Sequence, residues 1–357
     1  MEKKTEWEKV VEDRTNKLYN EGNIQIKDYR IQYIKANPQK GFNFGYLLIL
    51  PNNMRNHTMI IEGNNSQFKG NEKYYISEML KYGVKYGDHP MLPVKAPIMV
   101  PLLEAWEEVK LYNKNATREE ELYPQQLSRN TMLIKDPNDP NYRVDLQVLD
   151  MASDAREIIK NDYNFQLEDR YYLNGYSCSS SLALRLALIH PERIIGISTG
   201  GDGGLRPIPL EEFNGYKLHY PVGIFDFEKL FSKPFNEDAY RKINAFYYRG
   251  EDESKAMKTR IRDNGNGIYD DQYYNTANNR RLTDKNTGDL FNIVLGKRVE
   301  EKEANNELIY NQLGYNITHK TYPGGHTIDP GINTAIIDIN NHYIKCVSQV
   351  YKDNFVK

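Results

Sequence analysis

Apolar residues recur along this chain at two spacings, and the spacing changes from one segment to the next. Residues 5–19 carry apolar side chains at helical spacing and are followed by an Asn-Glu-Gly-Asn run, which predicts an amphipathic helix that stops there. Tyr29, Ile31 and Tyr33 then alternate with other residues, as in a half-buried strand. Short apolar runs bounded by Gly, Pro or Asn predict two further strands, at 46–50 and 58–61.

From residue 72 onward, segments with helical spacing alternate with short apolar runs. The predicted helices are 72–82, 145–161, 180–190, 299–313 and 334–350, and the predicted strands are 98–103, 171–174, 194–198, 243–248 and 317–322. Such alternation is typical of a mostly parallel sheet with helices on both faces. Pro101 interrupts one apolar run, so we expect that strand at a sheet edge or a bulge.

Two stretches, 200–240 and 254–296, break this rhythm. Long irregular segments in a compact domain are usually lids or insertions, so both are predicted to be cap-like insertions. We find no internal repeat and no low-complexity linker. The sequence therefore predicts one α/β domain over 46–357, preceded by an N-terminal extension, 1–45, that holds the first helix and first strand.

Charge and composition exclude several classes of partner. The chain has 47 Lys+Arg against 49 Asp+Glu, which leaves no electrostatic footprint for nucleic acid or an anionic membrane. No apolar run approaches the roughly 18 residues of a membrane span. The two cysteines make a disulfide framework unlikely. As written, the chain is expected to be soluble and cytoplasmic, or secreted or at the cell envelope if a signal peptide was removed; its oligomeric state stays open.

The segment Gly175-Tyr-Ser177-Cys-Ser179 joins a predicted strand directly to a predicted helix. This is the placement of a nucleophile elbow, in which a strained serine needs small residues two positions before and after it. Gly175 and Ser179 meet that need, which predicts Ser177 as a nucleophile. A plain Gly-Ser turn between strand and helix would have the same spelling.

A serine hydroxyl needs a base within hydrogen-bonding reach, and the chain has seven histidines. His326 follows the last predicted strand in the glycine-rich run Tyr-Pro-Gly-Gly-His-Thr, which agrees with the chain order serine, acid, histidine. The other six occupy positions typical of surface or packing roles. We therefore predict His326 as the general base.

An acidic run, Gly-Glu-Asp-Glu-Ser at 250–254, follows the strand predicted at 243–248 and is the expected place for the third residue. Asp252 has the commoner side chain for this role, whereas Glu253 lies further along a turn that could direct it at His326. The sequence leaves both candidates open. A solvated acidic loop tip is the alternative reading of the same run.

Backbone N–H groups are expected to bind the oxyanion that forms on the reacting carbonyl. Cys178, at the start of the helix after Ser177, is predicted to supply one donor. The second is predicted from Asn64 or Asn65, which follow Gly63 after an early strand. No His-Gly-Gly-Gly run is present, and an ordinary Gly-Asn turn would look the same.

With these motifs in order, the chain from about residue 46 resembles the α/β-hydrolase superfamily, in particular esterases related to polyhydroxybutyrate depolymerases and feruloyl or acetyl-xylan esterases. The resemblance is carried by three segments: NGYSCSSSLALRLALIHPERIIGISTGGDGG, FYYRGEDES and LGKRVEEKEANNELIYNQLGYNITHKTYPGGHT. It implies the α/β-hydrolase fold, a triad of Ser177, His326 and Asp252 or Glu253, ester substrates, and no metal or organic cofactor. Ser179 in place of a second glycine is a departure from the family pattern.

Two other functions fit the same residues. A hydrolase fold can be kept by a binding or sensory protein that performs no turnover, because fold alone does not establish function. A serine peptidase would use the same three side chains on an amide. Labelling of Ser177 by a fluorophosphonate separates the enzymes from the binder.

Overall fold

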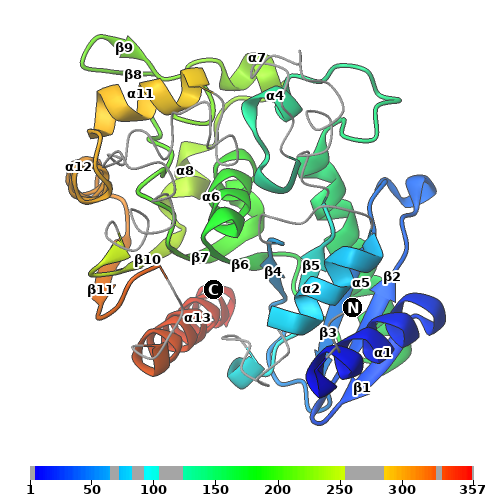
Figure 1. Cartoon of the computed structure of the whole chain (residues 1–357). Helices are drawn as coiled ribbons and strands as arrows, with labels where there is room; N and C mark the ends of the chain where they lie inside the picture. The colour runs from blue at the N-terminus through cyan, green and yellow to red at the C-terminus, as the bar shows by residue number, and fades with distance from the viewer. Residues whose placement is uncertain are drawn as a thin grey trace.

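A nine-stranded β-sheet forms the centre of the part of the chain that the structure describes. The computed structural model describes residues 5–64, 72–82, 92–103, 124–253, 285–326 and 332–355. Across the sheet the strands follow the order β1-β2-β3-β5-β4-β6-β7-β10-β11 (Figure 1). Their bounds are β1 Asn23–Ile26, β2 Tyr29–Ile34, β3 Tyr46–Pro51, β4 Ile60–Glu62, β5 Ile98–Pro101, β6 Tyr171–Tyr176, β7 Ile194–Gly200, β10 Asn244–Gly250 and β11 Ile317–Tyr322.

The sheet is antiparallel at one end and parallel over the rest. β1, β2, β3 and β5 pair antiparallel in that order. β5, β4, β6, β7, β10 and β11 pair parallel. Because parallel strands all run in one direction, their carboxyl ends lie along a single edge of the sheet. The loops that follow β4, β6, β7, β10 and β11 therefore meet at this edge.

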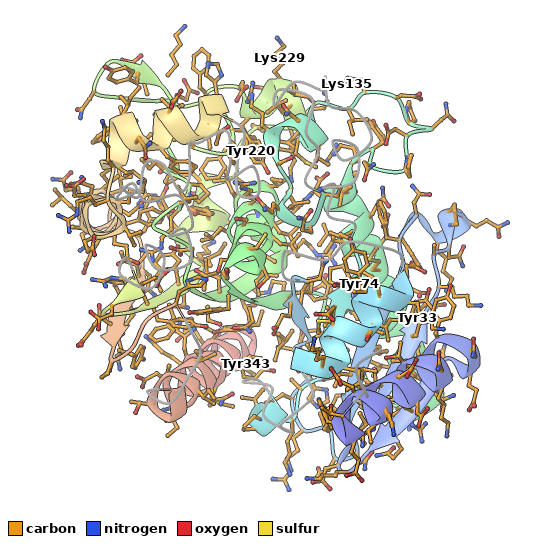
Figure 2. The ribbon with its side chains drawn as sticks, in the orientation of Figure 1. Tyr33, Tyr74, Lys135, Tyr220, Lys229 and Tyr343 are labelled. Atoms are coloured by element: carbon orange, nitrogen blue, oxygen red, sulfur yellow. The ribbon has the colours of Figure 1, made fainter. Side chains whose placement is uncertain are left out.

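Helices cover both faces of the sheet. α5 (Val144–Tyr163) and α6 (Cys178–Ile189) pack on one face, and α1 (Glu6–Glu21), α2 (Glu72–Tyr82) and α13 (Ile332–Phe355) contribute to the core on the other. Figure 1 shows α6 and α13 on opposite sides of β6 and β7. Tyr343 of α13, labelled in Figure 2, is fully buried and donates a hydrogen bond to the backbone oxygen of Thr58 at 2.8 Å.

The predicted insertion at 200–240 contains a hairpin, β8 (Glu212–Phe213) with β9 (Tyr216–Lys217), and two short helices, α7 (Phe227–Phe231) and α8 (Glu237–Arg241). A third apolar cluster joins residues 205–222 to α11 (Lys285–Leu295) and α12 (Val299–Gln312). Most of the second insertion, residues 254–284, lies outside the described residues. Further short helices are η1 (Pro38–Lys40), η2 (Leu92–Val94), η4 (Pro124–Gln126), α4 (Arg129–Met132) and η5 (Pro191–Arg193).

The prediction that Pro101 would confine its strand to an edge or a bulge is wrong, because β5 lies between β3 and β4. Pro101 is the last residue of β5, opposite Tyr46. The next residue, Leu102, donates its N–H to the backbone oxygen of Gly45 at 2.9 Å, so pairing continues past the proline. Because Pro101 stands at the end of the four-residue β5, its missing N–H does not interrupt the middle of the ladder.

Strand β1 was not expected from the sequence, which predicted only a helix stop at this place. Ile24 and Ile26 are buried while their neighbours are exposed, so the alternation is present but covers only four residues. α1 ends at Gly22, whose φ of 78° lies in the left-handed region that favours glycine. Gly22 is thus the single residue between the end of α1 and the start of β1.

The predicted fold class, a mostly parallel α/β sheet with helices on both faces, is confirmed. The exchange of β4 and β5 in the strand order, together with a serine turn after β6, identifies the α/β-hydrolase fold. β1 and β2 belong to the same sheet as the rest, and the division at residue 45 stays a prediction. Among the described residues, no helix is both long and apolar enough to span a membrane.

Candidate active site

Ser177 occupies the sharp turn between β6 and α6. Its φ of 58° and ψ of −125° lie outside the regions that residues with side chains ordinarily adopt. The turn is held from both sides, because the Ser177 N–H donates to the Gly200 oxygen at 2.8 Å and the Ser180 N–H donates to the Ser177 oxygen at 3.1 Å. This geometry leaves the serine side chain partly exposed at the carboxyl edge of the sheet.

The small residues around Ser177 are needed for different reasons. A Cβ added at Gly175 would lie 2.6 Å from the Ser179 backbone oxygen, so only glycine fits there. The Ser179 hydroxyl accepts a hydrogen bond from the Tyr176 N–H at 2.7 Å and donates one to the Tyr176 oxygen at 2.8 Å. Ser179 thus fits at the position of the second glycine in the G-x-S-x-G pattern, and its side chain braces the turn.

His326 lies beside Ser177, with Nε2 at 2.9 Å from the serine Oγ. The imidazole is buried between the ring of Tyr176, 5.3 Å away between centroids, and the backbone of Gly201. A Cβ at Gly201 would come within 2.9 Å of the imidazole Cε1. The imidazole therefore fits against the loop after β7 only because residue 201 is a glycine.

Glu253 is the carboxylate that contacts the histidine, with Oε1 at 3.1 Å from His326 Nδ1. Asp252 instead donates its backbone N–H to the Gly324 oxygen at 2.8 Å, and its side chain is exposed. Glu251 makes a similar backbone bond, to the Tyr322 oxygen, at 2.8 Å. These two bonds tie the acidic loop to the histidine loop and turn Glu253 inward.

Glu253 is shielded from solvent. Its side chain is 0% exposed, and burial raises the pKa of its carboxyl above the usual glutamate range. The negative charges of Asp202 and Glu303 act in the same direction, while the hydrogen bond to His326 opposes them. A buried carboxylate that accepts a hydrogen bond from a histidine ring orients that ring.

Of the three residues predicted to bind an oxyanion, Cys178 directly follows Ser177, and Asn64 follows Gly63 in the loop after β4. Cys178 is the first residue of α6, and the first N–H groups of a helix have no partner within the helix. Asn64 is buried and donates its side-chain amide to the Leu103 oxygen at 2.8 Å. A Cβ at Gly63 would lie 3.1 Å from that of Ser179, so this loop packs against the elbow. Asn65 lies outside the described residues.

A buried ionic cluster below the histidine was missed from the sequence. The loop after β7 contains Asp202, which accepts a hydrogen bond from Arg206 Nε at 2.9 Å and another from the Gly204 N–H at 2.8 Å. Arg206, 1% exposed, also donates to Glu303 of α12 at 3.2 Å. The sequence signal for this cluster was the spacing of Asp202 and Arg206, four residues apart in a glycine-rich run. The cluster holds the loop that carries Gly201.

Among the described residues, no group of three or more His, Cys, Asp or Glu is arranged to hold a metal ion. What the arrangement can do chemically depends on Ser177, His326, Glu253 and the backbone around them.

No family model and no curated protein sequence matches this chain. Solved structures that align with it include a carboxyl esterase from the fungus Tuber melanosporum, at 9% identity and a TM-score of 0.45 over 95% of this chain and 98% of that one. A poly(3-hydroxybutyrate) depolymerase from Bordetella parapertussis aligns at 12% identity and a TM-score of 0.44, over 91% of this chain and 92% of that one. An S-formylglutathione hydrolase from Agrobacterium tumefaciens aligns at 9% identity and 0.44, over 90% and 96%. The fold assignment itself depends on this chain's own strand order and elbow.

Proposed function

We propose that this protein is a serine hydrolase that cleaves carboxylic esters through Ser177, His326 and Glu253. The observation that carries the proposal is an unbroken pair of hydrogen bonds, from Ser177 Oγ to His326 Nε2 at 2.9 Å and from His326 Nδ1 to Glu253 at 3.1 Å. Each partner comes from a different loop at the carboxyl edge of the sheet. A serine in a strained turn with an oriented base is the arrangement that acyl transfer requires.

The mechanism follows from these distances. His326 Nε2 takes the hydroxyl proton of Ser177 as its Oγ attacks the ester carbonyl, and the carbonyl oxygen becomes an oxyanion. In this mechanism the N–H groups of Cys178 and Asn64 are the donors that stabilise that charge. The tetrahedral intermediate then expels the alcohol, which receives the proton from His326. Water, deprotonated by the same imidazole, attacks the acyl-enzyme and releases the acid.

Glu253 acts through the histidine. By accepting a hydrogen bond from Nδ1–H, Glu253 leaves Nε2 as the acceptor that faces Ser177, and its charge stabilises the imidazolium. The raised pKa of the buried Glu253 carboxyl is opposed by this same contact, since a charged histidine favours a charged glutamate.

The first test is Ser177→Ala. We expect hydrolysis of p-nitrophenyl acetate to fall by about 10⁴-fold or more and covalent labelling by a fluorophosphonate to disappear. Ser153→Ala is the matched control, because that hydroxyl lies on the exposed side of α5 and donates only to the Leu149 oxygen. Full hydrolysis by the Ser177 variant would refute the proposal. A folded wild-type protein that is not labelled would favour a non-catalytic binder, and faster cleavage of peptides than of esters would favour a peptidase.

A further inference from the structure

Three polar side chains form a row across β4, β6 and β7. Glu62 is opposite Asn174, and Asn174 is opposite Ser198, in the register of these parallel strands. Two residues earlier in each strand, Ile60 and Tyr172 belong to the apolar core that α13 covers. Since side chains alternate along a strand, the row lies on that same face, near the carboxyl edge.

The row is hydrogen-bonded in one direction only. The Ser198 hydroxyl donates to Asn174 Oδ1 at 2.6 Å, and Asn174 Nδ2 donates to Glu62 Oε2 at 2.8 Å. A carboxylate can only accept, so the amide of Asn174 must turn its nitrogen toward Glu62. Asn174 is 4% exposed, and a hydrogen bond from a buried amide to a charged acceptor is stronger than one between neutral groups.

The position of this bond links two parts of the candidate site. Glu62 is the last residue of β4 and directly precedes Gly63 and Asn64, while Asn174 precedes Ser177 in the strand that ends at the elbow. Glu62 and Asn174 are also the last registered pair between the two strands. Among the described residues the ladder between β4 and β6 stops at this pair, and the hydrogen bond from Asn174 to Glu62 lies at its end, next to the Asn64 loop.

We propose that Asn174 is a positioning residue that sets the distance between the Asn64 loop and Ser177 through its hydrogen bond to Glu62. The Asn64 side chain, bound to the Leu103 oxygen at 2.8 Å, holds the loop from the β5 side, and Asn174 holds it from the β6 side. The inference rests on the proposed serine hydrolase function. It adds that stabilisation of the oxyanion depends on a residue that does not touch the substrate.

The test exchanges donor and acceptor. Asn174→Asp removes the donated hydrogen bond and places a second carboxylate beside Glu62. Adding Glu62→Gln restores one bond with the roles reversed, because the new amide can donate to the new carboxylate. Asn141→Asp is the control for burying an acid, since Asn141 is a buried asparagine in the loop before α5. All variants are measured for fluorophosphonate labelling of Ser177, for kcat and KM with p-nitrophenyl acetate, and for the urea midpoint.

We expect kcat and the labelling rate of Asn174→Asp to fall by about 10- to 100-fold with KM changed little, because a misplacement of about 1 Å can cost that much. The double variant should recover most of the loss, and Asn141→Asp should label at the wild-type rate. The deficit of the single variant should also shrink as the pH falls, when one proton shared by the two carboxyls restores a bond.

Three results would overturn the proposal. If the wild type labels and Asn174→Asp labels equally fast, the positioning role is wrong while the hydrolase function stands. If the double variant stays as slow as the single one despite a wild-type urea midpoint, the loss does not come from this hydrogen bond. If the wild type itself does not label, both the function and the positioning role are wrong.

Discussion

Asp252 and Glu253 were both candidates for the carboxylate that contacts His326, and a one-residue difference in position decides between them. The two carboxylates are neighbours in the chain, yet one side chain is exposed and the other is fully buried against His326. The Asp252 N–H, bound to the Gly324 oxygen, turns the backbone so that the following side chain points inward. Proximity in sequence therefore says little about which acid reaches the imidazole.

This difference predicts opposite outcomes for two conservative variants. Glu253→Gln should lower kcat/KM for p-nitrophenyl acetate by about a thousandfold or more, because the amide can no longer favour the useful tautomer and the charged imidazole. Asp252→Asn, the matched control on an exposed side chain, should stay within about twofold of wild type. Equal losses in both variants, or a larger loss at Asp252, would contradict the assignment of Glu253.

The same residue makes a prediction about stability. Because burial raises the pKa of Glu253 in the folded protein, its ionisation costs folding free energy as the pH rises through that pKa. Glu253→Gln should therefore be at least as stable as wild type at pH 7 in urea unfolding, and the two should converge below about pH 4. If Glu253→Gln is less active than wild type but equally stable, Glu253 has a catalytic role and not only a structural one.

At the scale of elements, α6 is anchored at both ends. Its first turn carries the elbow, and its C-cap residue, His190, is buried and bonded to Asp145 of α5 at 2.9 Å. Arg143 adds a two-pronged contact to the same carboxylate, at 2.8 and 2.7 Å. Burial alone would raise the pKa of Asp145, but the hydrogen bonds from Arg143 and His190 outweigh it and lower the pKa to about 2.

This lowered pKa predicts how α6 responds to acid. A carboxyl whose folded pKa lies below its unfolded value stabilises the protein above the unfolded pKa, and that stabilisation is lost as the pH falls through the folded one. Asp145→Asn should cost about 2 kcal/mol of unfolding free energy at pH 7. The difference from wild type should shrink between about pH 4 and pH 2, measured by urea unfolding. A constant difference across that range would mean that the ionised carboxylate is not its source.

At the scale of the whole molecule, the first 45 residues complete the sheet. β2 pairs with β3 over six residues, and every residue of β3 is buried. α1 packs Val11 and Leu18 into the core on the same face as α2 and α13. An isolated chain starting at residue 46 would present β3 as an unpaired apolar edge, which is a site for aggregation.

Two truncations test whether the extension is separable. A chain of 46–357 is expected to be insoluble or unfolded by circular dichroism, because it lacks β1 and β2. A chain of 22–357, which keeps both strands and loses only α1, should fold with a lower melting temperature. If 46–357 folds and hydrolyses p-nitrophenyl acetate with wild-type kcat/KM, residues 1–45 are a separable extension, as the sequence predicted.

Features written in short stretches of sequence were predictable. Helical and alternating spacings placed the long helices and most strands within a few residues, because burying an apolar face requires that period. The elbow was legible for the same reason, since its steric demand falls on residues two positions from Ser177. β1 was not predictable, because a strand of four residues has too little alternation to recognise. The interior position of Pro101 was not predictable either, because the sequence does not show that the proline stands at the end of its strand.

The sequence alone thus determined the fold class, the nucleophile candidate Ser177 and the histidine candidate His326, each from residues near one another in the chain. Only the tertiary structure decided that Glu253 meets His326, that Asn174 meets Glu62, and that Arg206 joins Asp202 to Glu303. The physical reason is the same in all three cases. Each of these contacts includes a partner that is distant in sequence, such as Glu303 of α12 for Arg206, so it forms only when the two segments pack together.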